Sequence, residues 1–447
     1  MKIAALSTTL FWVAQAGCHA LPIHGHTVSS TPACSPDWVR ESSVPGVDPA
    51  QEQVDYWSAR SVPSDQVLLD PAGIRTLNRQ NAQKDVGFRD VLAPEIGANA
   101  RVEKDLNDRI QWLSTRLQDG TLIEETQGSF VQAVEQIRNA QATDELRIVH
   151  REATLHCIPL QAGLYSPPID RDFNRNRCSG LHPGELVRVL RRTSTRWVYV
   201  HTGHSVGWMH PDHLTPPLTE QSARQFRDDP QRLVATNGPI QTESTLVLRL
   251  GSSFPLSERR SNGTYVILGP TPTGLQPIVV AGNAPVHIGY LPFTRRNLWS
   301  LALSQLGQEY GWGGRGGHRD CSRLVMDVFS TFGIRLSRHS SYQRQNGTAM
   351  ATLQDKTETE KMALLQEMAR QGVVLLYMRG HIMILLGQNE ERLFAVSSLS
   401  EYVRPCGDGG EQVVRIDKVT VSDLELGRNT ERTAFMERLT TATVFAP

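Results

Sequence analysis

One stretch, residues 299–343, constrains the fold of this chain more than any other. It contains a glycine-rich turn at 311–317, then Asp320 and Cys321, and then apolar residues at helical spacing. This pattern predicts a helix that begins at Cys321 and ends near Gly333, with Asp320 as its N-cap. A cysteine in the first turn lies near unpaired backbone N–H groups and the positive end of the helix dipole, which favour a thiolate. We therefore predict that Cys321 is a nucleophile.

A cysteine nucleophile needs a base, and the sequence offers His381. The apolar run Val373–Met378 predicts a buried strand, and after a two-residue turn a second strand, His381–Gly387, begins at the histidine. If the helix of Cys321 packs across this sheet, the imidazole meets the thiol and forms a Cys–His pair for acyl transfer. The alternative is a histidine that only caps the strand, and the pairing with the cysteine helix favours the catalytic interpretation.

These segments together resemble a known family. The motifs YGWGG, RDCS, LVMDVF and FGI, followed by GHIMILLG, resemble the NlpC/p60 family of papain-like cell-wall peptidases. The resemblance is strongest to the branch with an N-terminal stabilising domain, and it extends to residues 289–307, 207–214 and 68–78. It implies an α+β fold, in which a papain-like catalytic domain follows a helical N-terminal domain and two small SH3-like β-barrels.

The resemblance also implies roles for single residues. Cys321 is expected to attack the γ-glutamyl carbonyl, while His381 holds the catalytic proton. The phenol of Tyr310 and the backbone N–H of Cys321 are expected to stabilise the oxyanion. Asp320 and Ser322 match positions that hold the free amine of an N-terminal L-alanine. The implied activity is hydrolysis of the D-γ-glutamyl–diamino-acid bond of peptidoglycan stem peptides, with diaminopimelate or L-lysine as the diamino acid.

The third catalytic position departs from the family pattern. The family places His, or sometimes Asn, Gln or Glu, on the strand after the catalytic histidine, whereas this chain has Ala395–Ser397 there. Ser397 is our candidate. Because the third group orients the imidazole, its loss weakens catalysis. A weakened or inactive wall-binding protein, or an amidase or acyltransferase on the same fold, therefore remains an alternative.

Length and patterning divide the chain into several parts. A chain of 447 residues is long enough for three or four domains of about 100–150 residues each. We expect a leader at 1–20, a linker at 21–50, a helical stabilising domain at 51–150, SH3-like domains at 151–217 and 235–293, and the catalytic domain at 294–447. Residues 218–234 are polar and are expected to form a linker.

The first residues predict export. Lys2 precedes an apolar run at 3–13, and small residues follow it, as in a secretory signal. The periplasm or cell envelope is the expected location. Cys18 also resembles a lipoprotein processing site, which would provide a lipid anchor, but Gln15 stands where an aliphatic residue is usual. Lipidation therefore remains open.

Export bears on the other cysteines, because disulfides persist in oxidising compartments. Cys34, Cys157, Cys178 and Cys406 allow three pairings. We prefer Cys157 with Cys178, since both fall in one small region.

The remaining signals argue against cofactors and nucleic acid. Lys and Arg balance Asp and Glu at 46 each, so the charge balance does not indicate a basic surface that would bind nucleic acid. The glycine-rich turn lacks the Lys-Ser/Thr of a phosphate loop. Four histidines, His201, His204, His210 and His213, imitate a zinc site, but surface histidines on strands are the preferred interpretation. We expect no metal and no cofactor, with peptidoglycan fragments as the partner.

Overall fold

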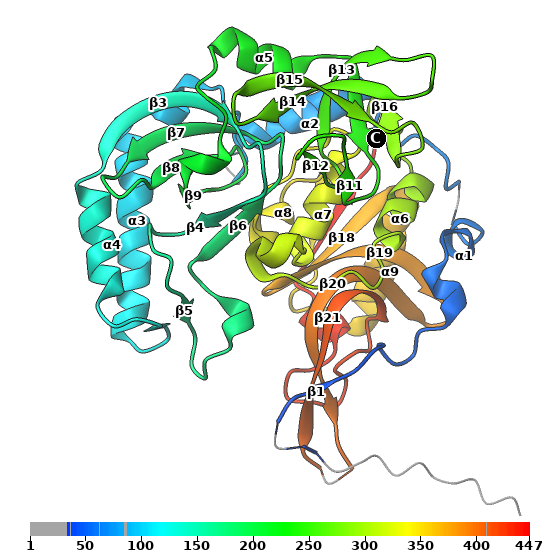
Figure 1. Cartoon of the computed structure of the whole chain (residues 1–447). Helices are drawn as coiled ribbons and strands as arrows, with labels where there is room; N and C mark the ends of the chain where they lie inside the picture. The colour runs from blue at the N-terminus through cyan, green and yellow to red at the C-terminus, as the bar shows by residue number, and fades with distance from the viewer. Residues whose placement is uncertain (1–33, 36, 62, 85–86, 408) are drawn as a thin grey trace, which may run out of the picture.

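The computed structural model of the chain describes residues 34–35, 37–61, 63–84, 87–407 and 409–447 (Figure 1). The predicted leader and Cys18 lie outside the described residues, as do residues 21–33 and 36 of the predicted linker. Within the described ranges, no helix combines the length and apolar character that a membrane crossing needs.

A seven-stranded sheet forms the C-terminal half, in the order β1-β21-β20-β19-β18-β22-β17. Its central strands are antiparallel, and Met378 lies opposite His381 across the turn between β18 and β19. The strand predicted at 373–378 is confirmed, and the one predicted from His381 is confirmed and runs on to Asn389. The strands are β1 (Val39–Arg40), β17 (Ala349–Thr352), β18 (Val373–Met378), β19 (His381–Asn389), β20 (Arg392–Pro405), β21 (Glu411–Asp423) and β22 (Thr441–Phe445).

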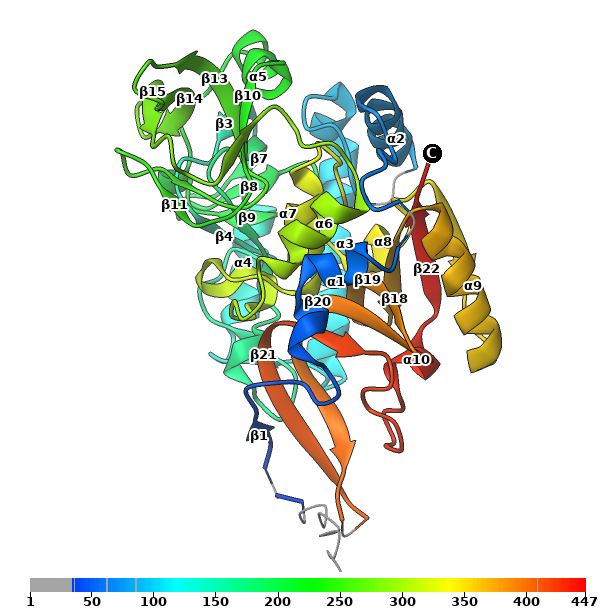
Figure 2. The same cartoon turned by 90° about the vertical axis from the view of Figure 1, so that its right-hand side faces the viewer.

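Helices cover both faces of this sheet, because its strands are apolar on both sides. Val373 and Leu375 of β18 pack with the residues of α7 (Cys321–Ser330). Val374 and Leu376 point the other way and pack against α9 (Glu358–Gln371). Figure 2 shows α7 and α9 on opposite sides of the sheet. The helices α6 (Arg295–Leu303), α8 (Ser340–Gln343) and α10 (Phe435–Arg438) complete this half.

The first β-rich region is a six-stranded antiparallel sheet in the order β3-β7-β8-β9-β4-β6. Its first strand begins at Gln141, so the β-rich region starts within the segment predicted to be helical to residue 150. The strands are β3 (Gln141–Ile148), β4 (Ala153–His156), β6 (Arg177–Leu181), β7 (Leu186–Arg192), β8 (Val198–His201) and β9 (Val206–Met209). A short pair, β2 (Ile123–Glu124) with β5 (Leu164–Tyr165), adjoins it.

The second β-rich region is a five-stranded sheet in the order β15-β14-β13-β10-β16. The prediction of a linker at 218–234 is wrong, because α5 (Glu220–Asp228) and the start of β10 lie there. The strands are β10 (Arg232–Ala235), β13 (Ser253–Arg259), β14 (Tyr265–Thr271), β15 (Gly274–Val280) and β16 (Val286–Ile288), with β11 (Ile240–Gln241) and β12 (Val247–Leu248) as a separate pair. That the two regions are SH3-like domains stays a prediction.

The N-terminal segment is divided between the other parts of the molecule. The helix α1 (Val54–Ser58) packs on α6, and Trp57 belongs to the core of the catalytic half. The helices α3 (Asn99–Gln118) and α4 (Ser129–Arg138) pack on the first β-rich sheet through a core that includes Leu113 and Trp208. The helix α2 (Pro71–Gln83) lies between α1 and α3 in the chain.

Two disulfides join parts of the chain. Cys157 pairs with Cys178, as predicted. Cys34 pairs with Cys406, which fastens the N-terminal segment to the turn between β20 and β21. β1 runs parallel to β21 beside this disulfide, at the lower end of the molecule in Figure 1.

Candidate active site

Cys321 is the first residue of α7, where the sequence predicted it. Asp320 caps the helix, and its side chain accepts a hydrogen bond from the backbone N–H of Arg323. The loop before it packs closely on the first β-rich sheet, because an added Cβ on Gly314 would lie 2.6 Å from the Cα of Gly180. Only glycine allows this approach, and Gly314 also has a positive φ of 81°. The glycine-rich turn thus fixes the cysteine against a neighbouring sheet.

The sheet brings His381 to the same place. His381 begins β19, and the side chain of the next residue, Ile382, packs in one core with Cys321. The backbone N–H groups of Ile382 and Ser322 both point to the Cys321 sulfur. Cys321 and His381 therefore lie at the same end of the sheet, and their action as a catalytic pair stays a prediction.

Ser397 stands on β20 beside the histidine. Its Oγ lies 3.0 Å from Nε2 of His381. The other ring nitrogen, Nδ1, is not engaged by this contact. In the tautomer that acts as a base, Nε2 carries the proton and donates it to Ser397, which fixes the ring plane. This contact is compatible with the expected role of Ser397 as the third residue, which stays a prediction.

The two reactive groups are both neutral at rest. Burial, together with the nearby carboxylate of Asp320, raises the pKa of Cys321 to about 12. Burial, together with the charge of Arg438, lowers the pKa of His381 to about 4. The sequence-based expectation of a thiolate is therefore wrong for the free protein, because desolvation outweighs the helix N-terminus. Thiol and neutral imidazole are the reacting forms.

Tyr310 lies beside the nucleophile in the loop before α7. Burial, followed by the charges of Asp320 and Cys321, raises the pKa of Tyr310 well above its usual value. The phenol therefore keeps its proton and can donate a hydrogen bond. Its ring is 6.2 Å from that of Phe173, a residue of the first β-rich region. The expected role at the oxyanion stays a prediction, and this position is compatible with it.

Asp320 and Ser322 are joined to a residue that the sequence did not single out, Arg338. The Arg338 guanidinium donates to both oxygens of Asp320, at 3.0 and 2.6 Å, and also to Oγ of Ser322 at 2.8 Å. Further donors to the carboxylate are the backbone N–H groups of Gly313 and Arg323 and the hydroxyl of Ser322. Although burial raises the pKa of Asp320, Arg338 lowers it below its usual value. The carboxylate is thus ionised, and Arg338 balances its charge.

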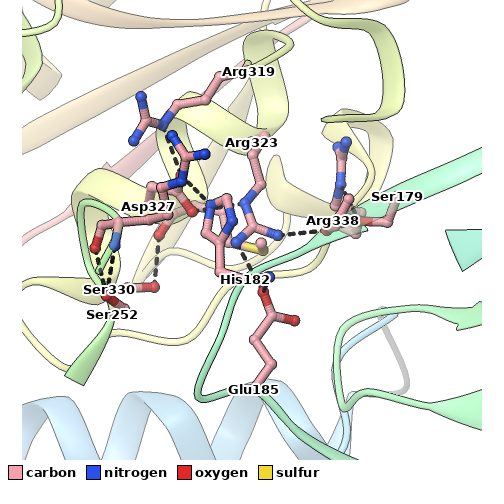
Figure 3. Close-up of polar contacts among 12 residues, drawn as sticks. Ser179, His182, Glu185, Ser252, Arg319, Arg323, Asp327, Ser330 and Arg338 are labelled. Carbon is pink, nitrogen blue, oxygen red and sulfur yellow. Dashed lines mark hydrogen bonds and ion pairs between the residues drawn. The ribbon is translucent and has the colours of Figure 1, made fainter. Parts of the chain in front are cut away.

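A buried ion network holds α7 against the first β-rich sheet (Figure 3). Asp327 accepts hydrogen bonds from Arg319 and Arg323, each at 2.7 Å, and lies 3.2 Å from His182. Arg323 also donates to Glu185 at 2.9 Å and to the carbonyl of Gly180 at 2.9 Å. The network joins α7 to Arg319 in the preceding loop and to His182 and Glu185 of the first β-rich region, so it fixes the helix that carries Cys321.

The four histidines predicted to lie on strand surfaces have separate partners. His201 is buried, contrary to that interpretation, and its Nδ1 accepts from the backbone N–H of Gly203 at 2.9 Å. His204 pairs with Glu185, His210 with Gln161, and His213 with the carbonyl of Glu152. In the described part of the chain, no cluster of side chains has the form of a metal site.

Comparison with known proteins identifies one part of the chain. Residues 307–401 match the model of the NlpC/P60 family, so the chain carries an NlpC/P60 domain there. A structure described as a novel NlpC/P60 endopeptidase from Photobacterium damselae subsp. piscicida is similar over 93% of this chain and 100% of that chain. The identity is 16% and the TM-score 0.68, which shows a shared fold.

Other comparisons give less. An NlpC/P60 family protein from Bacillus cereus aligns over 68% of this chain and 100% of that one, with 15% identity and a TM-score of 0.46. NlpC2 from Trichomonas vaginalis aligns over 63% and 97%, with 13% identity and a TM-score of 0.24. Neither TM-score supports an argument about this chain. A search among curated proteins gave no match.

Proposed function

We propose that this protein is an exported cysteine peptidase that hydrolyses the D-γ-glutamyl–diamino-acid bond of peptidoglycan stem peptides. The proposal is supported by two observations inside the segment that matches the NlpC/P60 family. Cys321 lies against Ile382, the residue after His381 at the start of β19, and Nε2 of His381 is 3.0 Å from Oγ of Ser397. The choice of bond, the diamino acid and the export are parts of the proposal that rest on the resemblance of the sequence.

The mechanism follows from the neutral resting pair. As the Cys321 sulfur attacks the carbonyl carbon, Nδ1 of His381 takes the thiol proton, and the hydrogen bond to Ser397 holds the ring in place. The carbonyl oxygen becomes an oxyanion, which the backbone N–H of Cys321 and the phenol of Tyr310 stabilise. The imidazolium then protonates the leaving amine, and an acyl-enzyme remains. Water hydrolyses the thioester after losing a proton to the same imidazole.

The predicted requirement for a free N-terminal amine is the part that the geometry supports least. Asp320 and Ser322 were expected to hold this ammonium. However, both oxygens of the Asp320 carboxylate already accept hydrogen bonds, and Arg338 supplies the compensating charge. An ammonium would have to compete with a guanidinium that donates to both oxygens. Substrates with and without the free amine therefore belong in the test.

The test is mass spectrometry of peptides incubated with the purified protein under reducing conditions. The substrates are L-Ala-γ-D-Glu-diaminopimelate, its lysine analogue and the N-acetylated form of each. We expect the wild-type protein to release the dipeptide with L-Ala and D-Glu, and Cys321→Ala to release none. A loss of at least about 10³-fold is expected for removal of a nucleophile. Equal products with Cys321→Ala, or no cleavage of any peptide, would overturn the proposal.

A further inference from the structure

A cavity of about 230 Å³ lies beside α7, on the side of the helix that faces the second β-rich region. Its lining comes from residues 88–91, from both β-rich regions and from the catalytic half. At its edge, Gly251 lies so close to α7 that an added Cβ would be 2.3 Å from the carbonyl oxygen of Asp327. The cavity is therefore enclosed by parts of the chain that are far apart in sequence, and the proposed reaction does not use it.

Two arginines in the lining have no carboxylate partner in the described part of the chain. Arg232, at the start of β10, is only 5% exposed. Its guanidinium donates to four backbone carbonyls and to Oγ of Ser253, all of which are uncharged. Arg335, which follows α7, is partly buried, and its guanidinium has neither a hydrogen bond nor an ion pair among the described residues. Both positive charges are thus left without a paired anion.

The charges of these two arginines also act on each other. Burial lowers the pKa of Arg232, and so does the charge of Arg335. The carboxylates of Asp228 and Asp229 oppose this effect, but neither residue lines the cavity. Asp228 is moreover bound to Arg227 through both of its oxygens. Because a buried charge is costly unless an opposite charge compensates it, this part of the cavity favours an anion.

Hydrogen-bond donors for such an anion are present. Nη2 of Arg232 carries two hydrogens, and among the described residues its one acceptor is the carbonyl of Ser253. The five N–H groups of Arg335 add to this donor. Tyr290, which lines the same cavity, contributes a phenol. Guanidinium groups bind the oxygens of carboxylates and phosphates through strong, charge-assisted hydrogen bonds.

The acidic groups of the lining are already paired, so they neither attract a cation nor neutralise the two arginines. Asp90 pairs with Arg227. Glu185 and Asp327 both pair with Arg323, within the ion network of Figure 3. The rest of the lining is in part apolar and includes Phe88, Leu250, Met326 and Leu336. An anion with a small apolar body therefore fits the lining as well as an inorganic anion does.

We propose that this cavity is a binding site for a small anion, whose carboxylate or phosphate group lies between Arg232 and Arg335. The site is separate from the catalytic residues, and the proposal does not depend on the peptidase activity. Met326 and Asp327 of α7 line the same cavity. A bound anion therefore joins the second β-rich region to the helix that begins at Cys321.

The test is isothermal titration calorimetry on the full chain, at constant ionic strength and in a buffer without phosphate or carboxylate. The probes are inorganic phosphate and benzoate, with benzyl alcohol as the neutral counterpart of benzoate. We expect at least one of the two anions to bind with a Kd of about 1 mM or tighter. Binding of phosphate alone assigns the site to phosphate groups, and binding of benzoate alone assigns it to carboxylates with an apolar body. Benzyl alcohol should bind at least about tenfold more weakly than benzoate.

Arg335→Glu is the decisive variant, because it places a carboxylate near Arg232 and so replaces the anion. We expect it to weaken anion binding at least about tenfold, while the ligand-free protein keeps its Tm or gains in Tm. Arg335→Lys, which retains the charge, should keep more of the affinity than Arg335→Glu does. Arg259→Glu is the matched control, since Arg259 is exposed on β13 of the same region and lies outside the cavity. It should leave the Kd unchanged.

The proposal is overturned if neither anion binds, or if benzyl alcohol binds as tightly as benzoate. Anion binding that survives Arg335→Glu, or that falls equally in Arg259→Glu, would also overturn it. A lower Tm of the ligand-free Arg335→Glu protein would show that the positive charge of Arg335 is already compensated, which contradicts the premise of the site.

Discussion

At the scale of single residues, the charge state of the reactive pair decides how the site can work. A thiol with a pKa of about 12 and an imidazole with a pKa of about 4 do not exchange a proton at rest. The nucleophile must therefore be generated during attack, when the proton moves to His381. This makes the orientation of the imidazole important, and Ser397 is the group that controls it.

Replacing Ser397 with alanine tests this role. The hydrogen bond from Nε2 to Oγ is a neutral one, worth about 1 kcal/mol, so we expect kcat to fall roughly five- to tenfold with little change in KM. Ser397→Asn, which restores an acceptor, should recover part of the rate. Steady-state kinetics on the stem tripeptide measure both.

Ser400→Ala provides the control for the Ser397 variants. Ser400 lies on the same strand and is partly exposed. Its replacement should leave kcat unchanged. A Ser397→Ala protein with the wild-type kcat would show that the imidazole needs no third residue here.

Single residues also show what the sequence could predict about the site. The positions of Cys321 and His381 could be predicted because each stands at a local boundary, a helix start and a strand start, that the pattern of apolar residues marks. Their catalytic roles stay predictions. Arg338 was missed, because its role depends on a contact with Asp320, which lies 18 positions away in the chain. No local sequence pattern indicates such a contact. The resting thiol was missed for a similar reason, since burial is a property of the folded surroundings.

At the scale of elements, α7 carries both the nucleophile and the ion network that positions it. Three cationic or potentially cationic groups, Arg319, Arg323 and His182, converge on Asp327, and the site is almost fully buried. Such a cluster is stable only while the charges balance, because unpaired ions are costly in a low-dielectric interior.

Asp327→Asn is predicted to be strongly destabilising. It removes one negative charge and leaves two buried guanidinium groups with Glu185 as the remaining acid in the network, so we expect a loss of about 3–5 kcal/mol in the free energy of unfolding. Urea unfolding measures it. Asp108→Asn is the control, since its partner Lys104 and Asp108 itself are both exposed, and it should change stability little. Equal effects of the two substitutions would contradict the structural role of the network.

The elements that the sequence predicted correctly are those whose apolar residues form a clear pattern along the chain. The strand at 373–378 and residues 382–386 of the next strand are apolar and pack on both faces of the sheet, so their pattern was unambiguous. The helix α5 was assigned to a linker because its buried apolar side chains are only Ala223 and Phe226. Its stability comes from packing on β3 and β13, which the local sequence does not reveal.

At the scale of the whole molecule, contacts between distant parts of the chain define the fold around the site. The Cys34–Cys406 disulfide joins residues 372 positions apart, and β1 adds a parallel strand to the edge of the catalytic sheet. Composition and spacing left the pairing of Cys34 open for this reason. In contrast, Cys157 and Cys178 are 21 residues apart in one sheet, so the sequence could place them together.

The whole molecule also contains buried histidines, which should make its stability depend on pH. Burial lowers the pKa of His156 and His381 to about 4 and that of His201 to about 3. Between pH 6.5 and these values the unfolded chain binds protons that the folded chain excludes. The free energy of unfolding therefore falls as the pH falls through this window. The carboxylates of Asp327 and Glu185, whose pKa values lie below their usual range, lose their contribution only at lower pH.

We expect the protein to lose at least about 2 kcal/mol between pH 7 and pH 5, the amount that one such histidine supplies over 1.5 pH units. Urea unfolding at the two pH values measures the difference. His201→Asn should reduce the dependence, because Oδ1 of asparagine can accept the hydrogen bond from Gly203 without titrating. Equal stability at both pH values would mean that the folded and unfolded chains take up the same number of protons, so that folding would not lower the pKa values of these histidines. The neutral resting state assigned to the His381 imidazole by burial would then lose its support.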